Sequence, residues 1–329
     1  MFACLCGCGR TDAPSLDSSA FGSGQTYSLA IGYGASESDS LHSALQELSE
    51  KVSASSNGAI NIDLYSSEEL GSVFEIAEQV RAGNLDGVVL TSDEALPYCP
   101  QISVLRLPFL FRNYGDVESV LNSDVSSEIT EGFLDHQMVP IAFFGGALWQ
   151  ISNQLRPVEN PQDLTGMMLH TTDDELTLTV YERFGALPAP LERTELAEAM
   201  QKKVFHGAVG SLNDLRENGL ESVQNYLSVL NIQYDAEILI FSEETWDSLP
   251  NGVQKIISSC AAESGKKQRD QIAGSEEALL QSLSNNMEII EPDRKAFKEI
   301  SDPIYDQYIS QNSWADELIR HIKKQIKEA

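Results

Sequence analysis

The chain is poor in basic residues and lacks the motifs of common enzymes. Its 329 residues include 22 Lys and Arg against 50 Asp and Glu, which gives a formal charge of −28. Such a surface lacks the basic footprint that binds nucleic-acid phosphates or anionic lipid headgroups, so we expect neither as a partner. The sequence holds no P-loop, no G-x-S-x-G elbow, and no CxxC or HExxH spacing. We therefore expect no catalytic residues, no metal and no cofactor.

Cysteine is also scarce, with five residues, and it clusters at the N-terminus. The Leu-Cys-Gly-Cys of residues 5–8 resembles a bacterial lipobox, with Cys8 as the lipidated residue, and a Ser- and Gly-rich stretch follows it. We expect residues 1–26 to be a signal remnant and lipoprotein tether, although the basic and long apolar regions of a signal peptide are missing and a frayed terminus is the alternative. Cys99 and Cys260 are either one disulfide or two buried thiols.

Apolar residues follow two different periods in the first third of the chain. Residues 27–33, 59–65 and 88–90 have the short apolar or alternating pattern of strands. Residues 40–53 and 71–81 repeat apolar side chains at helical spacing. Strands that alternate with helices predict an α/β lobe with a largely parallel sheet.

Two apolar segments and one long helical segment organise the rest of the chain. Residues 139–152 and 236–241 read as strands, the first passing from one lobe to another and the second returning. Residues 243–283 are compatible with helix throughout, with glycines as possible kinks. We predict two discontinuous lobes, made of residues 27–150 plus about 236–270, and of residues 151–235 plus about 271–329.

Several ordered segments together resemble one known family. These segments are Glu69-Leu-Gly71, Leu107-Pro-Phe-Leu-Phe111, Asp163-Leu-Thr-Gly166, Phe184-Gly-Ala-Leu-Pro188 and Trp246-Asp-Ser-Leu-Pro250. Their order and spacing resemble the substrate-binding subunit of tripartite ATP-independent periplasmic (TRAP) transporters, the DctP-type family. The resemblance implies a two-lobed α/β fold like that of periplasmic binding proteins, with crossing strands and a long helix that links the lobes. It also implies an extracytoplasmic protein that captures a small organic solute between the lobes and delivers it to a membrane permease.

The resemblance implies a ligand site, and this chain departs from it. The family generally places a carboxylate-binding arginine after the Asp-Leu-x-Gly turn, where this chain has His170. A second frequent arginine falls at Trp149, and a frequent polar residue falls at Gly210. Arg193 is the candidate that replaces this clamp, with His170 beside it, and an organic acid is then the favoured ligand.

An amine or zwitterion is the alternative ligand, and a neutral or aromatic solute is a third. Glu94 falls near an expected pocket position, and Asp235 and Glu237 stand where the second crossing strand begins. Glu94 or Asp235 would hold a cationic group. Tyr33 and Trp149 offer aromatic faces that attract cations or enclose a ring.

Two other classes of protein stay open. One is an extracytoplasmic sensory subunit with the same binding chemistry. The other is a lipoprotein hydrolase that uses His170 or His206, although no nucleophile motif accompanies either histidine.

Overall fold

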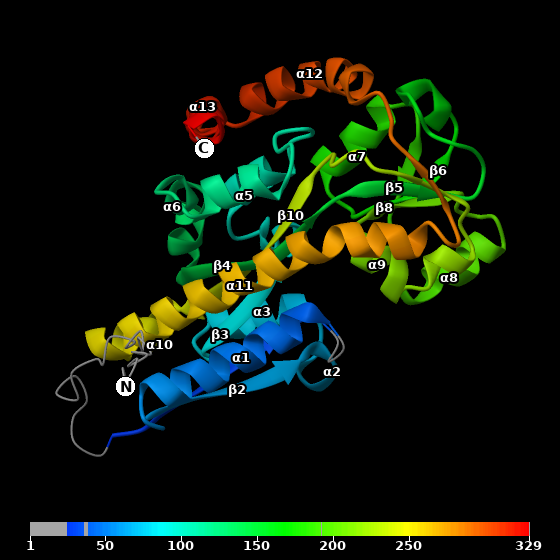
Figure 1. Ribbon diagram of the computed structural model, residues 1–329. Coiled ribbons are helices and arrows are strands. Elements are labelled where there is room, and N and C mark those ends of the chain that lie inside the picture. Colours follow the sequence, from blue (N-terminus) through cyan, green and yellow to red (C-terminus); the bar gives the residue numbers. More distant parts are fainter. Residues whose placement is uncertain (1–24, 36–38, 192, 329) are drawn as a thin grey trace, which may run out of the picture.

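Two mixed β-sheets form the framework of the molecule. The computed structural model describes residues 25–35, 39–191 and 193–328, with the side chains of residues 193 and 194 left out of the description (Figure 1). The first sheet has the order β2-β1-β3-β10-β4 and the second the order β11-β9-β5-β8-β6-β7. The strands of the first sheet are β1 (Tyr27–Tyr33), β2 (Ile60–Ser66), β3 (Gly87–Thr91), β4 (Met138–Leu148) and β10 (Tyr234–Ser242). Those of the second are β5 (Gln150–Asn153), β6 (Met168–His170), β7 (Leu187–Ala189), β8 (Gly207–Gly210), β9 (Tyr226–Ser228) and β11 (Glu288–Ile290).

Helices cover both sheets, and most lie where the apolar spacing predicts them. The α-helices before β4 are α1 (Ser40–Ser55), α2 (Ser67–Leu70), α3 (Val73–Arg81), α4 (Ser92–Ala95), α5 (Tyr114–Leu121) and α6 (Val125–Thr130). Those after β6 are α7 (Glu175–Arg183), α8 (Arg193–Gln201), α9 (Leu212–Glu217), α10 (Glu243–Ser248), α11 (Asn251–Leu283), α12 (Arg294–Gln311) and α13 (Ala315–Glu328). Short 3₁₀ helices are η2 (Pro100–Arg106), η3 (Glu131–His136), η4 (Pro161–Leu164) and η5 (Leu220–Ser222). None of the helices in the described ranges is long and apolar enough to cross a membrane.

The two lobes are joined where the first sheet gives way to the second. Strands β4 and β10 pair antiparallel, with Tyr234 opposite Leu148, and the chain then runs through Trp149 into β5 of the second sheet. The long helix α11 packs on β4 and α1 and also reaches α9 beside the second sheet (Figure 1). The expected two-lobed α/β fold with crossing strands and a long linking helix is therefore present.

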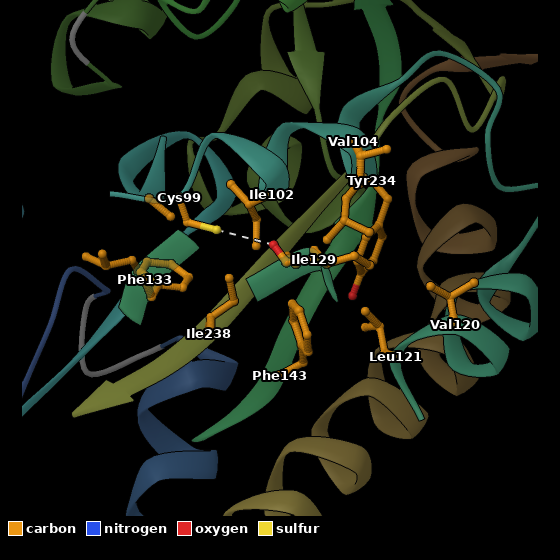
Figure 2. Packing of buried hydrophobic residues seen from close by; sticks show 14 of the residues in the cluster. Cys99, Ile102, Val104, Val120, Leu121, Ile129, Phe133, Phe143, Tyr234 and Ile238 are labelled. Atoms are coloured by element: carbon orange, nitrogen blue, oxygen red, sulfur yellow. Dashed lines mark hydrogen bonds between the residues drawn. The ribbon is translucent and has the colours of Figure 1, made fainter. Parts of the chain in front are cut away.

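Strand β10 separates two chemically different environments. Ala236 and Ile238 are fully buried in the apolar core on one side, where Ile238 packs among the side chains shown in Figure 2. Successive side chains of a strand point to opposite faces, so Asp235 and Glu237 point to the other side. That side leads toward the space between the lobes.

The predicted lobe boundaries stay a prediction, with one refinement. Helix α13 packs against α5 and α6 of the first lobe, and its buried residues share the core of β10. This contact favours placing residues 315–328 with the first lobe, whereas the sequence analysis grouped them with the second.

The structure distinguishes between the alternatives for the two internal cysteines. Cys99 and Cys260 are both buried and both free, so they are two separate thiols. The Cys99 thiol donates to the Ile129 carbonyl at 3.2 Å (Figure 2), and burial raises its pKa to about 11. Cys8 lies outside the described residues.

Candidate functional site

A large cavity lies between the two lobes. Its volume is about 880 Å³, within the range of about 300–1,000 Å³ that is usual for small-molecule sites. The first lobe contributes the end of β3, the start of β10 and the end of β4 at Gly146 and Ala147. The second lobe contributes the segments that follow β6 and β8, together with part of α8. A solute in this cavity would touch both lobes.

Acidic side chains line the first-lobe wall of the cavity. They are Asp39, Asp93, Glu94, Asp235 and Glu237. Asp39 caps the N-terminus of α1 by accepting from the Leu41 amide at 2.8 Å. These residues come from three separate parts of the sequence, so the sheet order brings them together and their spacing along the chain does not.

The second-lobe wall is acidic as well. Asp173, Glu195, Asp214 and Glu217 line it. Among the described side chains, no lysine or arginine lines the cavity. The side chain of Arg193 lies outside this description. Both walls therefore present negative charge to a solute.

Two of these carboxylates have a structural role at helix starts. Glu94 accepts from the Thr91 amide at 2.9 Å and closes the capping box of α4. Asp214 accepts from the Ser211 amide at 3.0 Å and does the same for α9. Such caps stabilise helix N-termini, so both positions are explained in part without a ligand.

Asp235 and Glu237 have few hydrogen-bond partners within the protein. One oxygen of Asp235, Oδ1, is buried and has no hydrogen-bond partner, and Glu237 accepts from Gln268 Nε2 at 3.2 Å. Burial, with further repulsion from Asp93 and Glu94, raises the pKa of Asp235 to about 7 despite the attraction of Arg106. Burial and the charge of Asp39 raise the pKa of Glu237 to about 8. Each carboxyl group therefore has too little positive charge near it to offset its burial and the neighbouring acids.

Arg106 is a functional neighbour of the cavity that the sequence analysis did not single out. Its side chain is completely buried and forms an ion pair with Asp174, with Nη2 3.1 Å from Oδ2. The same nitrogen donates to Thr172 Oγ1 at 2.7 Å, so η2 of the first lobe is tied to the segment that opens α7 in the second. Burial opposes the charge of Arg106, yet the acids Asp235 and Asp174 keep its pKa above the usual value. A single arginine inside the apolar run of residues 104–111 was the signal for a buried, paired charge.

Trp149 lies between Arg106 and the cavity. The guanidinium carbon of Arg106 is 4.7 Å from the centre of the Trp149 ring, so this cation occupies one face of the indole. The ring is only 5% exposed, although it contributes to the cavity wall. Trp149 is thus a partly covered wall residue and not an open aromatic platform.

Five of the seven predicted ligand-binding residues line the cavity. His170 and Gly210 line the cavity together with Trp149, Glu94 and Asp235. His170 pairs through Nε2 with the Leu191 carbonyl at 2.9 Å, and its ring meets Phe205 edge-on.

The structure does not place Tyr33 at the cavity wall. Its ring is 2% exposed and packs in the core around α1, where its hydroxyl meets His42 Nδ1, and its neighbours Gly34 and Ala35 line the cavity instead. A strand residue facing the core cannot also face the cleft, which is why the position next to it takes that place. Arg193 begins α8, and its side chain lies outside the described part.

Comparison with characterised proteins agrees with this architecture. The family profile "Bacterial extracellular solute-binding protein, family 7" (DctP) matches residues 31–312. The 2,3-diketo-L-gulonate-binding periplasmic protein YiaO of Escherichia coli is 22% identical, over 90% of this chain and 91% of its own length. The sialic acid-binding periplasmic protein SiaP of Vibrio cholerae is also 22% identical, over 86% and 88%.

Solved structures show the same fold. A TRAP periplasmic solute-binding protein from Chromohalobacter salexigens with bound D-glucuronate has a TM-score of 0.83 and 22% identity, and the match covers 90% of this chain and 99% of that one. One from Sulfitobacter sp. NAS-14.1 with bound β-D-galacturonate has a TM-score of 0.82 and 21% identity, with the same coverage. The match of the family profile to most of the chain, together with this shared fold, shows that the protein belongs to the bacterial extracellular solute-binding proteins of family 7, the DctP family.

Proposed function

We propose that this protein captures a small organic solute in the cavity between its lobes and delivers it to a TRAP-type membrane permease. The observation that carries the proposal is the cavity of about 880 Å³ lined by both lobes, in a chain whose family consists of solute-binding proteins. A solute that contacts both walls stabilises the closed arrangement over the open one, because it gains contacts with the second lobe only on closure. The loaded, closed protein is then the form that the permease recognises.

A small organic acid is the first class of solute to test. The solved relatives named above hold D-glucuronate and β-D-galacturonate. In this chain His170 lines the cavity, and Arg193 at the start of α8 is the proposed replacement for the arginine clamp. A guanidinium is suited to a carboxylate because it offers two parallel N–H donors. The amine and zwitterion alternative has its own supporting observation, the two acidic walls.

Binding alone accounts for this role, and we propose that the protein is not an enzyme. Capture and release need no nucleophile and no general base, and closure is driven by contacts with the solute. Members of this family are periplasmic, and we propose that Cys8 carries a lipid that anchors the chain at the membrane surface.

The melting temperature of the full chain against a library of organic acids, amines, amino acids and aromatics tests the function. A ligand at about 100 times its dissociation constant adds roughly 2.7 kcal/mol of stability. We expect that gain to raise the melting temperature by several degrees for the right class, at about 2–4 °C per kcal/mol.

Variants then test the assignment of the cavity. Alanine at Trp149, His170 and Arg193 together is expected to abolish the shift, whereas alanine at the exposed Leu134 is the control that leaves it unchanged. A triple variant with unchanged affinity would remove these residues from the site. Absence of any shift, in a protein from which denaturation releases no small molecule, would refute the function.

A further inference from the structure

The acidic walls bear on which solute enters this cavity. On the basis of the function proposed above, we infer that the solute carries a positively charged nitrogen, which Asp235 and Glu237 hold on the first-lobe wall. The inference covers organic amines and also amino acids, in which a carboxylate accompanies the nitrogen.

The placement of these two residues supports the inference. They lie two positions apart on β10, so they share the face of the strand that looks into the cavity. The residues between and beyond them, Ala236 and Ile238, are fully buried on the opposite face. The strand therefore holds both carboxylates in place, and neither can turn toward the core to find a partner.

The backbone of β4 packs closely against β10 beside the two carboxylates. Gly145 of β4 approaches so closely that an added Cβ would lie 2.7 Å from Glu237 Oε2 and 2.6 Å from Gln268 Nε2. Gly146, at φ +118°, likewise comes close to Asp235, whose carbonyl an added Cβ would meet at 2.2 Å. The two glycines thus let β4 lie close to β10, with Gly145 beside the Glu237 carboxylate and Gly146 beside the Asp235 backbone, while both acidic residues still line the cavity.

The hydrogen bonds of the two carboxylates are incomplete. Asp235 Oδ1 is buried without a hydrogen-bond partner, and the amide of Gln268 is a neutral donor to Glu237. Buried carboxylates normally accept from several donors, and an unmatched one is unfavourable. An ammonium group offers three N–H donors and a positive charge, so it matches what these oxygens lack.

The pKa values point the same way. Both carboxyl groups hold their protons more tightly than usual because burial and neighbouring acids disfavour their charge. A bound cation reverses this effect, so its arrival is accompanied by release of protons near pH 7. An anion in the same place has the opposite effect and takes protons up.

A metal ion or an aromatic cage would also suit an acidic wall, but the structure favours neither. Within the described ranges, no group of three or more His, Cys, Asp or Glu side chains is arranged to hold a metal ion. The indole of Trp149 already has Arg106 over one face, so an aromatic cage for the cation is not built there. Carboxylates are therefore the groups that recognise the charged nitrogen.

Calorimetric titration of the full chain with matched compounds tests the inference. Each carbon skeleton is offered as the diamine, the amino acid and the diacid, as in 1,4-diaminobutane, 4-aminobutanoate and butanedioate, over a set of chain lengths, rings and methylated amines. Titration at pH 7 in two buffers of different ionisation enthalpy gives the number of protons exchanged. We expect the nitrogen-bearing member of at least one skeleton to bind more tightly than its diacid, with proton release.

Variants locate the binding group. The double substitution Asp235→Asn and Glu237→Gln is expected to weaken binding of the nitrogen compound by about 30-fold or more, the usual effect of removing a buried charged partner. The control is Glu131→Gln with Asp135→Asn, which makes the same two kinds of substitution at exposed positions. Because the site variant removes repulsion from the empty cavity, we expect it to melt no lower than the parent at pH 8, which separates loss of binding from loss of fold.

Each outcome has a distinct meaning. Tight binding of diacids alone, with proton uptake, would overturn this inference and leave the proposed function standing. Unchanged affinity of a nitrogen compound in the site variant would overturn it too, because Asp235 and Glu237 would not be the groups that bind. Binding of no skeleton, together with no released small molecule, would refute the proposed function itself.

Discussion

The two faces of β10 carry residues of opposite character within a few ångströms of one another. On one face, Ala236, Ile238 and Ile240 are completely buried in the apolar core of the first lobe. On the other, Asp235 and Glu237 line the cavity, and Leu239 and Phe241 continue this face into the apolar core around α1. The apolar face follows the ordinary rule for a stable core, and the acidic face departs from it. Departures of this kind are typical of functional sites.

A buried arginine, Arg106, partly offsets the negative charge of the acidic residues. Arg106 lies behind them, fully buried, and attracts Asp235 as well as its partners Asp174 and Asp93. One buried cation thus serves several carboxylates from both lobes. Asp235 and Glu237 still line the cavity, and their pKa values remain raised to about 7 and about 8.

The largest expected effect on stability comes from placing a carboxylate on the apolar face of β10. Ile238→Asp places an unpaired carboxylate where no water reaches, and we expect it to lower the free energy of unfolding by more than about 4 kcal/mol. Urea unfolding measures this loss. Ile238→Val, which removes one methylene, is the control and should cost about 1 kcal/mol. Equal behaviour of the two variants would mean that this face of β10 is not the core.

Removing the shared cation should have the next largest effect. Arg106→Met keeps the length of the side chain but leaves Asp174 without its partner, and we expect a loss of about 3–5 kcal/mol. Arg320→Met breaks an exposed pair with Asp316 and should change stability by less than about 1 kcal/mol. Both are measured by urea unfolding at pH 7. A loss from Arg106→Met no greater than that of the control would show that the acids do not depend on it.

The smallest expected effect is a difference in how the free energy of unfolding depends on pH. The folded pKa values of Asp235 and Glu237 are raised to about 7 and about 8, so between pH 4 and pH 8 the folded chain binds more protons at these sites than the unfolded chain does. Their contribution to stability is therefore largest at low pH and is lost as the pH rises toward 8.

Urea unfolding of the ligand-free protein at pH 5.5 and pH 8.5 measures this contribution. We expect the parent to lose stability between the two values by on the order of 1–3 kcal/mol more than the Asp235→Asn, Glu237→Gln variant does. Carboxyl groups with lowered pKa, such as Asp116, act mainly below pH 4.5 and affect both proteins alike. Identical pH dependence in the two proteins would argue against the raised pKa values.

Much of the fold was predictable because its elements bury one regular face. The period-two and helical patterns of residues 27–90 predict β1 to β3, α1 and α3 to within a few residues, and they miss the short helix α2. The apolar run of residues 139–152 likewise predicts the passage through β4 into β5. Short strands such as β9 and β11 were missed, because three residues carry too little pattern to stand out.

The candidate site was predictable only in part, for a physical reason. Counting along family motifs placed Trp149, His170, Gly210, Glu94 and Asp235 at the cavity. Tyr33 was expected there too, but it packs in the core while Gly34 and Ala35 line the cavity, because one step along a strand moves a side chain to the other face. It also gave no warning of Arg106, whose importance depends on residues distant in the sequence, such as Thr172 and Asp174.

Helix α11 is fastened very unevenly along its length. At Gly265 it lies so close to β4 that an added Cβ would stand 2.2 Å from the Phe143 carbonyl, and Arg269 bonds to that same carbonyl and to Glu118. Further along the helix, Gly274 has open space around it, and Ile272 before it borders the cavity. Past Gly274, Leu279 and Leu283 are buried again in the core of the second lobe. The helix is therefore packed against both lobes and loosely packed between them, so any bending that accompanies lobe movement concentrates near Gly274.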